Sequence, residues 1–282
     1  MNQSTATVIS NQQVLKELER LNDSTRRRAP DILGTWIIRF SCPEIAREAR
    51  PGQYLMVTCG EDTLLPRPFS IHQVKNGEIA ILYAVIKGGK GTGWLSRLEK
   101  GDELKLFGPL GNPFEIHPDS RNLLLVAGGL GIAPLSFLAA SALEQGLRVI
   151  LCLGASGETK PSGEANPNQL FPLSFLPPGI QVSTITSSAD GKTGNVTELL
   201  TEFIERSDQV FACGPTPMYR AMAGMAELKN KPVQVSLEVR MACGRGLCYG
   251  CSVKTKRGMK KVCETGPVFE LDDIIWDELN PS

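Results

Sequence analysis

Four of the eight cysteines lie within one short stretch near the carboxyl end of the chain, and their spacing constrains the fold more than any other feature. The stretch contains a C-x4-C-x2-C motif, and a further cysteine follows after eleven residues; the four are Cys243, Cys248, Cys251 and Cys263. In plant-type [2Fe–2S] sites with this spacing, a tight loop supplies three thiolates and a distant cysteine completes the ligand set. The spacing therefore predicts that these four cysteines hold a [2Fe–2S] cluster.

Two other interpretations of the cysteines stay open on the sequence alone: a zinc site and a set of unrelated buried thiols. Structural zinc sites usually combine two short cysteine pairs, whereas one loop here carries three of the four cysteines. Three nearby glycines, Gly244, Gly246 and Gly250, favour the iron–sulfur interpretation. Glycine tolerates positive φ and lets backbone N–H groups come close to the sulfur atoms of a cluster.

Because a [2Fe–2S] cluster carries one electron at a time, the rest of the chain is expected to contain a source of electrons. With 282 residues, the chain is long enough for more than one domain. Thirty basic and thirty acidic residues cancel, which gives no indication of a nucleic-acid or membrane surface. The sequence has no apolar run that could cross a bilayer and no hydrophobic leader. Since clustered thiols suit a reducing compartment, we expect a cytoplasmic protein without membrane insertion.

The first half of the chain is predicted to contain an extension and an antiparallel domain. Residues 1–30 are polar and are expected to form a solvated extension, with a short helical pattern near 14–21. Residues 31–118 contain short runs of β-branched and aromatic residues between glycine and proline turns, at 35–40, 53–59, 78–86 and 102–108. This pattern is typical of a small antiparallel β-barrel, and no helix is expected before residues 94–98.

Two stretches of the predicted barrel have the character of anion sites. The first, RPFSI at 67–71, is expected between strands; its arginine offers a planar fork for a pyrophosphate and its serine a hydroxyl for a ring nitrogen. The second, KGGKGTG at 87–93, is expected to precede a helix that begins near Trp94 and whose N-terminus attracts anions. Each signal is weak alone, because Gly91 and Thr92 also fit an ordinary turn and helix cap.

The hydrophobic pattern changes after residue 118. An apolar strand over 122–127 leads into the turn GGLGIAP, a helix through about residue 145 and a second buried strand over 148–154. This is a βαβ unit whose glycines lie at the carboxyl end of a strand, where parallel sheets bind ligands. Another strand at 209–212 ends in CGPTPM before a helix over 219–228. Residues 119–232 are therefore predicted to form a parallel α/β domain, and residues 233–282 a small cluster domain. The long connection at 156–179 is expected to be a mobile surface loop, with an insertion over a site as the alternative.

The motifs RPFSI, GGKGT, GGLGIAP, CGPTPM and MACGRGLCYGC with VCETGPVF, in this order, resemble the ferredoxin-reductase-like flavoproteins that carry a C-terminal [2Fe–2S] domain. More narrowly, about residues 31–275 are similar to the electron-transfer subunits of NAD-dependent, two-subunit dihydroorotate dehydrogenases. The chain departs from the pattern at Ala84, where an arginine is usual, and in a glycine turn that reads GGLG rather than GGGIG. The resemblance implies an antiparallel β-barrel that binds FAD, an α/β domain that binds NAD(H) and a small [2Fe–2S] domain.

The resemblance also implies individual site residues. Those that bind FAD are Arg67, Pro68, Phe69, Ser70, Tyr83, Val85, Gly91 and Thr92. Arg67 is expected on phosphate and Ser70 beside the isoalloxazine ring. Those that bind the nicotinamide nucleotide are Gly128, Gly129, Gly131, Cys213, Gly214 and Pro215. The implied metal ligands are Cys243, Cys248, Cys251 and Cys263.

The implied function is electron transfer between a nicotinamide nucleotide and an FMN-containing catalytic subunit that oxidises dihydroorotate to orotate in pyrimidine biosynthesis. A nicotinamide releases two electrons as hydride and a cluster accepts one, so FAD must stand between them. Similar domain orders occur in input subunits of hydrogenases, sulfite reductases and transhydrogenases and in self-sufficient reductases, whereas an iron sensor needs no nucleotide cleft. No acid–base catalyst is predicted in this chain, and His72 and His117 are expected to be structural.

Overall fold

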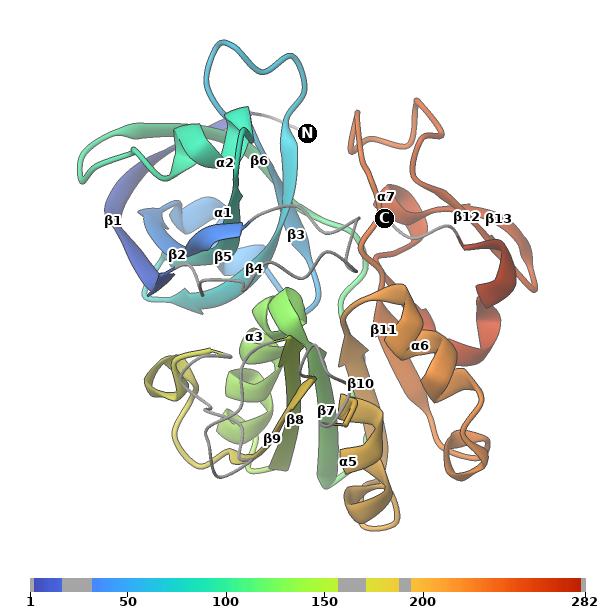
Figure 1. The fold of residues 1–282 in the computed structure, drawn as a ribbon. Coiled ribbons are helices and arrows are strands. Elements are labelled where there is room, and N and C mark those ends of the chain that lie inside the picture. Colours follow the sequence, from blue (N-terminus) through green and yellow to red (C-terminus); the bar gives the residue numbers. More distant parts are fainter. Residues whose placement is uncertain (1–2, 17–31, 157–170, 188–193, 280–282) are drawn as a thin grey trace.

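The computed structural model describes residues 3–16, 32–156, 171–187 and 194–279. Figure 1 shows three regions: a barrel in blue to green, a sheet with helices on its faces below it, and a carboxyl-terminal segment in orange and red beside both. No helix within these ranges is long and apolar enough to cross a membrane.

Six antiparallel strands close into the barrel in the order β1-β2-β5-β4-β3-β6. They are β1 (Ser4–Lys16), β2 (Ile32–Ser41), β3 (Tyr54–Val57), β4 (Arg67–Lys75), β5 (Glu78–Ile86) and β6 (Glu103–Leu110), with two short helices, α1 (Pro43–Glu48) and α2 (Lys90–Leu95). Alternate side chains of β5, such as Ile79 and Ile81, point into an apolar core, as the period of two along a strand requires. The predicted antiparallel barrel is confirmed.

The prediction of a solvated extension is wrong for residues 4–16, which form β1. This strand pairs with β2 along most of its length, for example Thr7 with Ser41, and with β6 through Ser4 and Leu106. Its inward side chains Ala6 and Val8 are 0% and 1% exposed. A polar, low-hydrophobicity sequence is sufficient here because the closing strand of a barrel gains its stability from hydrogen bonds on both edges. The helical pattern near 14–21 is contradicted for 14–16, and residues 17–21 lie outside the described residues.

The second region is a six-stranded sheet in the order β14-β11-β10-β7-β8-β9. Its strands are β7 (Asn122–Gly128), β8 (Arg148–Ser156), β9 (Gln181–Ser187), β10 (Gln209–Cys213), β11 (Val233–Ser236) and β14 (Val268–Glu270), and its helices are α3 (Ile132–Glu144), α5 (Val196–Phe203) and α6 (Thr216–Ala223). All neighbouring strands are parallel except β14, which runs antiparallel to β11. The three strands predicted from apolar runs are present.

The cluster segment is tied into this sheet. Its own elements are the hairpin β12 (Ser252–Thr255) and β13 (Gly258–Lys261) and the short helix α7 (Val262–Thr265). Both β11 before the cysteine loop and β14 after α7 pair into the α/β sheet, although each was predicted within the cluster domain. The sheet therefore holds both ends of the cysteine-bearing segment.

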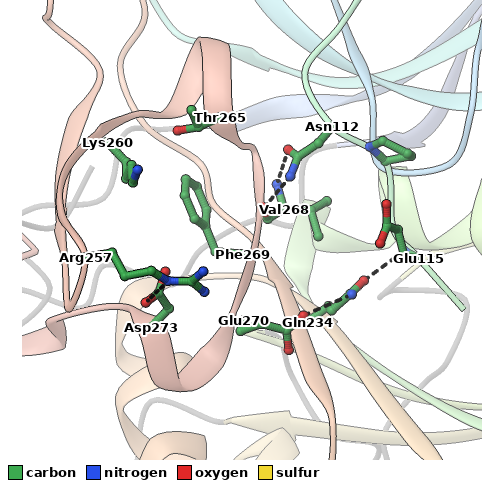
Figure 2. A pocket seen from close by; sticks show the side chains of 11 residues that line it. Asn112, Glu115, Gln234, Arg257, Lys260, Thr265, Val268, Phe269, Glu270 and Asp273 are labelled. Carbon is green, nitrogen blue, oxygen red and sulfur yellow. Dashed lines mark hydrogen bonds and ion pairs between the residues drawn. The ribbon is translucent and has the colours of Figure 1, made fainter. Parts of the chain in front are cut away.

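Side-chain amides close the seam between the three regions (Figure 2). The Asn112 side chain accepts the N–H of Val268 at 3.3 Å and donates to its carbonyl at 2.9 Å. Gln234 accepts the N–H of Glu115 at 2.9 Å and donates to the Glu270 carboxylate at 3.1 Å. A polar cavity of about 320 Å³ lies at this seam. The two amides use both of their polar ends, so they join the barrel linker to the sheet and to the strand that follows the cluster.

His72 on β4 joins the barrel to α3. Its ring is 0% exposed, and Nδ1 donates to the carbonyl of Ala133 at 3.0 Å. The ring packs edge-on against Phe171, which is 1% exposed, so the described end of the predicted loop at 156–179 is partly buried. The Nε2 atom has no partner among the described residues. Burial lowers the pKa of His72 to about 4, and the ring is therefore neutral at physiological pH.

We expect His72 to make the stability of the protein sensitive to acid. Unfolded histidine takes up a proton near pH 6.5, whereas the folded ring stays neutral down to about pH 4. The unfolded state therefore binds more protons within that window. As the pH is lowered from 6.5 to 4, the free energy of unfolding decreases by up to about 3 kcal/mol and then levels off. Urea unfolding at both ends of the window measures this loss.

The exposed His117 provides the matched control. His72→Gln is expected to flatten the pH dependence, because glutamine does not titrate, whereas His117→Gln should retain the wild-type slope. An unchanged slope in His72→Gln would contradict this account of acid sensitivity.

Candidate redox-cofactor sites

The cysteine loop between β11 and β12 turns backbone N–H groups toward the sulfur atoms of Cys243 in the loop and Cys263 in α7. The N–H of Gly246 donates to Sγ of Cys263 at 3.2 Å, and that of Arg245 to Sγ of Cys243 at 3.4 Å. Gly244 and Gly246 have φ of 61° and 72°, a region that favours glycine. The glycines are therefore needed for the conformation that directs the N–H groups to sulfur.

The four thiols approach one another in two pairs. The Cys248 thiol donates to Cys243, and Cys251 is hydrogen-bonded to Cys263. Each iron of a [2Fe–2S] cluster takes two protein thiolates, so two pairs fit the cluster. Among the residues that the structure describes, no three His, Cys, Asp or Glu side chains converge on a single metal ion.

The loop favours the thiolate at Cys243. Burial acts to raise the pKa of Cys243, but the N–H groups of Arg245 and Cys248, the Cys248 thiol and the N–H of Leu247 outweigh it and lower the pKa to about 6. Burial, together with the bond to Cys251, instead raises the pKa of Cys263 to about 11. Since metals bind thiolates, iron would displace the proton of Cys263.

One end of this site lies at the molecular surface. Cys251 and Cys263 are buried, whereas Cys248 is exposed. The neighbouring Leu247 and Tyr249 have exposed fractions of 76% and 67%, unusually large for such side chains. The loop tip therefore offers an apolar surface beside a predicted cluster ligand.

The RPFSI motif is the first part of β4, so its prediction as a connection between strands is wrong. Residues 67–70 pair with β3, from Val57 opposite Arg67 to Tyr54 opposite Ser70. A polar residue and a proline at its start obscured the strand, but the barrel provides the pairing partner. The half-buried Ser70 hydroxyl has no hydrogen-bond partner in the described part of the chain, which leaves it available to a ligand.

The two predicted FAD stretches meet at Arg67 and Gly91. A Cβ atom at Gly91 would lie 3.5 Å from Cγ and 3.6 Å from Nε of Arg67, so the glycine lies directly beside the arginine side chain. The helix predicted near Trp94 begins at Lys90 instead, which places Gly91 and Thr92 in its first turn. Thr92 Oγ1 accepts the N–H of Ile86 at 3.4 Å and closes the glycine turn. A cation beside a glycine backbone fits an FAD pyrophosphate.

The other predicted FAD residues belong to the barrel. The Tyr83 and Val85 side chains lie in its core, where the Tyr83 hydroxyl donates to Asn11 Oδ1 at 3.0 Å. Phe69 packs edge-on against Tyr83 with ring centroids 6.0 Å apart, and Pro68 pairs with β3. A contact of Tyr83 or Val85 with FAD would have to come from the backbone, and it stays a prediction.

The predicted nicotinamide residues come together at the carboxyl ends of the adjacent parallel strands β7 and β10. A Cβ atom at Gly131 would overlap the carbonyl oxygen of Cys213, and one at Gly128 would lie 2.6 Å from Cδ of Pro215. Gly214 lies against Gly128, while Gly129 has φ of 56° and open space around it. Burial raises the pKa of Cys213 well above its usual range, so this thiol is neutral. Two glycine turns in backbone contact are a suitable edge for a nucleotide.

Family models match two parts of the chain. One, described as the iron-sulfur cluster binding domain of dihydroorotate dehydrogenase B, matches residues 238–275. The other, an oxidoreductase FAD-binding domain, matches residues 34–114. The matched ranges contain the cysteine loop and most of the barrel with its Arg67–Gly91 contact.

Relatives and solved structures agree with these matches. A protein from Caldanaerobacter subterraneus subsp. tengcongensis is 37% identical over 82% of this chain and 89% of its own length, and one from Desulforamulus reducens is 35% identical over 86% and 93%. Both are named dihydroorotate dehydrogenase B (NAD(+)), electron transfer subunit. The structure of an NADH-dependent reduced ferredoxin-NADP oxidoreductase covers 98% of this chain and 91% of that one, with TM-score 0.76 and 26% identity. The ferredoxin reductase of carbazole 1,9a-dioxygenase, with TM-score 0.62 and 16% identity over 83% of this chain and 68% of that one, shares the fold.

Barrel, parallel sheet and cysteine loop together define a ferredoxin-reductase-like flavoprotein with an iron–sulfur segment. Within that class, the chain belongs to the family of dihydroorotate dehydrogenase B (NAD(+)) electron transfer subunits. The predicted fold class and family are confirmed, and the alternatives drawn from hydrogenases, sulfite reductases and transhydrogenases are not favoured.

Sequence reasoning missed the residues on which the cysteine loop rests. They are Tyr54, Met56 and Phe107, which lie on β3 and β6 and share an apolar core with Cys251 and Cys263. The only sequence signal is that β3 is apolar at consecutive positions, whereas β6 alternates until Leu106 and Phe107. Such a run indicates a strand buried on both faces, but it does not indicate what covers the second face.

Anaerobically purified protein is expected to contain about one FAD and about two iron and two acid-labile sulfide per chain. Cys263→Ser should lose most of the iron and retain the FAD, because it removes one ligand of the buried pair. Metal, sulfide and flavin analyses of the same samples measure both effects.

Cys152→Ala is the matched control, since Cys152 is a buried thiol on β8 that belongs to neither pair. It should retain the iron. Wild-type protein with zinc and no iron, or Cys263→Ser with a full iron content, would show that the ligand assignment is wrong.

Proposed function

We propose that this protein carries electrons between NAD(H) and a separate catalytic subunit that oxidises dihydroorotate to orotate in the cytoplasm. The observation that carries the proposal is the paired-cysteine loop packed on an FAD-binding barrel, in a chain 37% identical to an electron transfer subunit of this kind. The proposed partner contains FMN and receives the electrons through its contact with the cysteine loop.

The residues of this chain bind and separate the cofactors. When bound, FAD exchanges a hydride with NAD(H) and single electrons with the [2Fe–2S] cluster. Arg67 and the Gly91 turn hold the FAD pyrophosphate, and Ser70 donates to the flavin ring. Gly131 and Cys213 line the nucleotide edge, where the neutral thiol adds no charge beside the nicotinamide. Orientation of these groups, rather than acid–base chemistry, is the contribution of the protein.

The histidines support the assignment of substrate chemistry to the partner. Oxidation of a carbon substrate needs a positioned acid or base with a pKa near neutrality. His72 is buried with a pKa of about 4, and its Nδ1 is engaged by Ala133. His117 is exposed on the linker between barrel and sheet. Neither histidine is suited to abstract a proton from a substrate at the nicotinamide edge.

The isolated protein is therefore expected to reduce an artificial dye with NADH and to leave dihydroorotate unchanged. Adding the catalytic subunit should create NAD-linked dihydroorotate oxidation, because only then does the substrate have an acid–base site connected to this chain. Absorbance assays for NADH and orotate measure both reactions. Steady dihydroorotate turnover by this chain with NAD as sole acceptor, and no second protein on a gel, would contradict the proposal.

The apolar tip of the cysteine loop is expected to dock the catalytic subunit. Leu247→Asp should weaken binding of that subunit about tenfold or more, because it places a charge in a desolvated contact. NADH:dye activity should be unchanged, since Leu247 is not among the residues assigned to FAD or NAD(H).

Met259→Asp is the matched control. Met259 has a similar exposed fraction, 64%, and belongs to the β12–β13 hairpin instead of the cysteine loop. Titration calorimetry with the purified catalytic subunit compares the two. If both substitutions weaken binding equally, or if neither weakens it, the loop tip is excluded as the specific contact.

A further inference from the structure

The outer face of the barrel beneath the cysteine loop is built from two neighbouring strands. In the pairing of β3 with β6, Tyr54 lies opposite Leu110 and Met56 opposite Phe107. These four side chains are at most 7% exposed and belong to the same apolar core as Cys251 and Cys263. The barrel and the cluster segment thus share one core and do not merely touch.

Three contacts connect this face to the cluster segment. The Tyr54 hydroxyl donates to the carbonyl oxygen of Cys263 at 3.4 Å. A Cβ atom at Gly244 would lie 2.7 Å from Cγ of Met56, so the glycine allows the loop to rest on the methionine. The Arg245 guanidinium lies 4.5 Å from the centre of the Phe107 ring. The first contact therefore lies at the predicted ligand Cys263, and the other two lie just after the predicted ligand Cys243. Each thiol pair has one member held in this way.

Tyr54, like Met56 opposite Pro68, is paired through its backbone with β4, but of the three side chains it is the one that hydrogen-bonds a predicted ligand residue. On the second edge of β3 it pairs with Ser70, the residue proposed to donate to the flavin ring. The next residue on β4 is also fixed there, since the N–H of Ile71 donates to the carbonyl of Gln53 at 3.0 Å. One residue thus reaches the flavin strand through its backbone pairing and the ligand segment through its side chain.

We propose that Tyr54 is a positioning residue that holds the cluster-bearing segment at a set distance from the flavin-binding strand and so keeps electron transfer between them fast. The proposal rests on the cofactor assignment under "Proposed function". Each transfer moves one electron from reduced FAD to the oxidised cluster, and no bond to Tyr54 forms or breaks. The Tyr54 ring also fills the interface between the barrel and the cluster segment, so that water does not enter between them.

Two substitutions separate the ring from the hydroxyl. Tyr54→Leu removes both, and Tyr54→Phe removes the hydroxyl alone. Anaerobic stopped-flow mixing with NADH follows flavin bleaching and cluster bleaching in the same trace. In Tyr54→Leu, flavin bleaching should proceed at the wild-type rate, whereas cluster bleaching should slow on the order of tenfold. The reason is that the flavin and the cluster are no longer held at a fixed distance. Tyr54→Phe should recover most of the cluster rate.

A second measurement reports the docking itself. Loss of the hydroxyl bond in Tyr54→Phe should raise hydrogen exchange of the α7 amides about fivefold, the effect of about 1 kcal/mol. The midpoint potential and iron content of Tyr54→Phe should equal those of the wild type, because no sulfur ligand changes. Phe40→Leu is the control: it removes a 0% exposed ring from the opposite, inner barrel core and should leave the cluster rate unchanged.

The outcomes separate this inference from the function on which it rests. Wild-type protein whose flavin is not bleached by NADH would refute the proposed function. With wild-type bleaching intact, an unchanged cluster rate in iron-replete Tyr54→Leu would overturn the role of Tyr54. If Tyr54→Leu does not retain iron, Tyr54→Phe decides: unchanged exchange at α7 would overturn the role, and increased exchange at an unchanged potential would support it.

Discussion

The packing of the cysteine-bearing segment on the outer face of β3 and β6 is the contact on which the redox arrangement depends. A cluster loop joined to the barrel only by a flexible linker would sample many distances from the flavin. Here both ends of the segment pair into the α/β sheet through β11 and β14, and its middle shares an apolar core with Tyr54, Met56 and Phe107. Burial of these side chains ties the ligand geometry to the fold of the barrel.

The neighbouring barrel strand β4 faces the nucleotide domain. β4 pairs with β3 on one edge and carries His72, whose ring donates to Ala133 in the first turn of α3. That helix follows the glycine turn at Gly131, which rests on the Cys213 carbonyl. One continuous series of packed elements is therefore formed by the nucleotide edge, the proposed flavin-binding strand β4 and the cysteine loop. With the cofactors at the proposed sites, their order along this series would be the order in which two-electron chemistry becomes one-electron transfer.

The sequence was most informative where a local pattern carries the chemistry. Cysteine spacing predicted the four clustered cysteines as one ligand set, and continuous apolar runs located β5, β7, β8 and β10, because such runs are typical of strands buried on both faces. The sequence was least informative where stability comes from distant partners. Polar β1 closes the barrel, and the motif at Arg67 is a strand because β3 pairs with it. The role of Tyr54 depends on a residue 209 positions away and has no local signature.

Electron paramagnetic resonance of protein reduced by NADH alone tests the central claim most directly, because it detects the cluster only after electrons have passed through the whole series. Under anaerobic conditions, the account predicts a rhombic signal of a reduced [2Fe–2S] cluster that integrates to about one spin per chain. FAD-free protein, still iron-replete, should give no such signal with NADH and the full signal with dithionite. Two results would contradict the account: reduction of the cluster by NADH equally well without FAD, or reduction of the FAD-containing protein by dithionite but not by NADH.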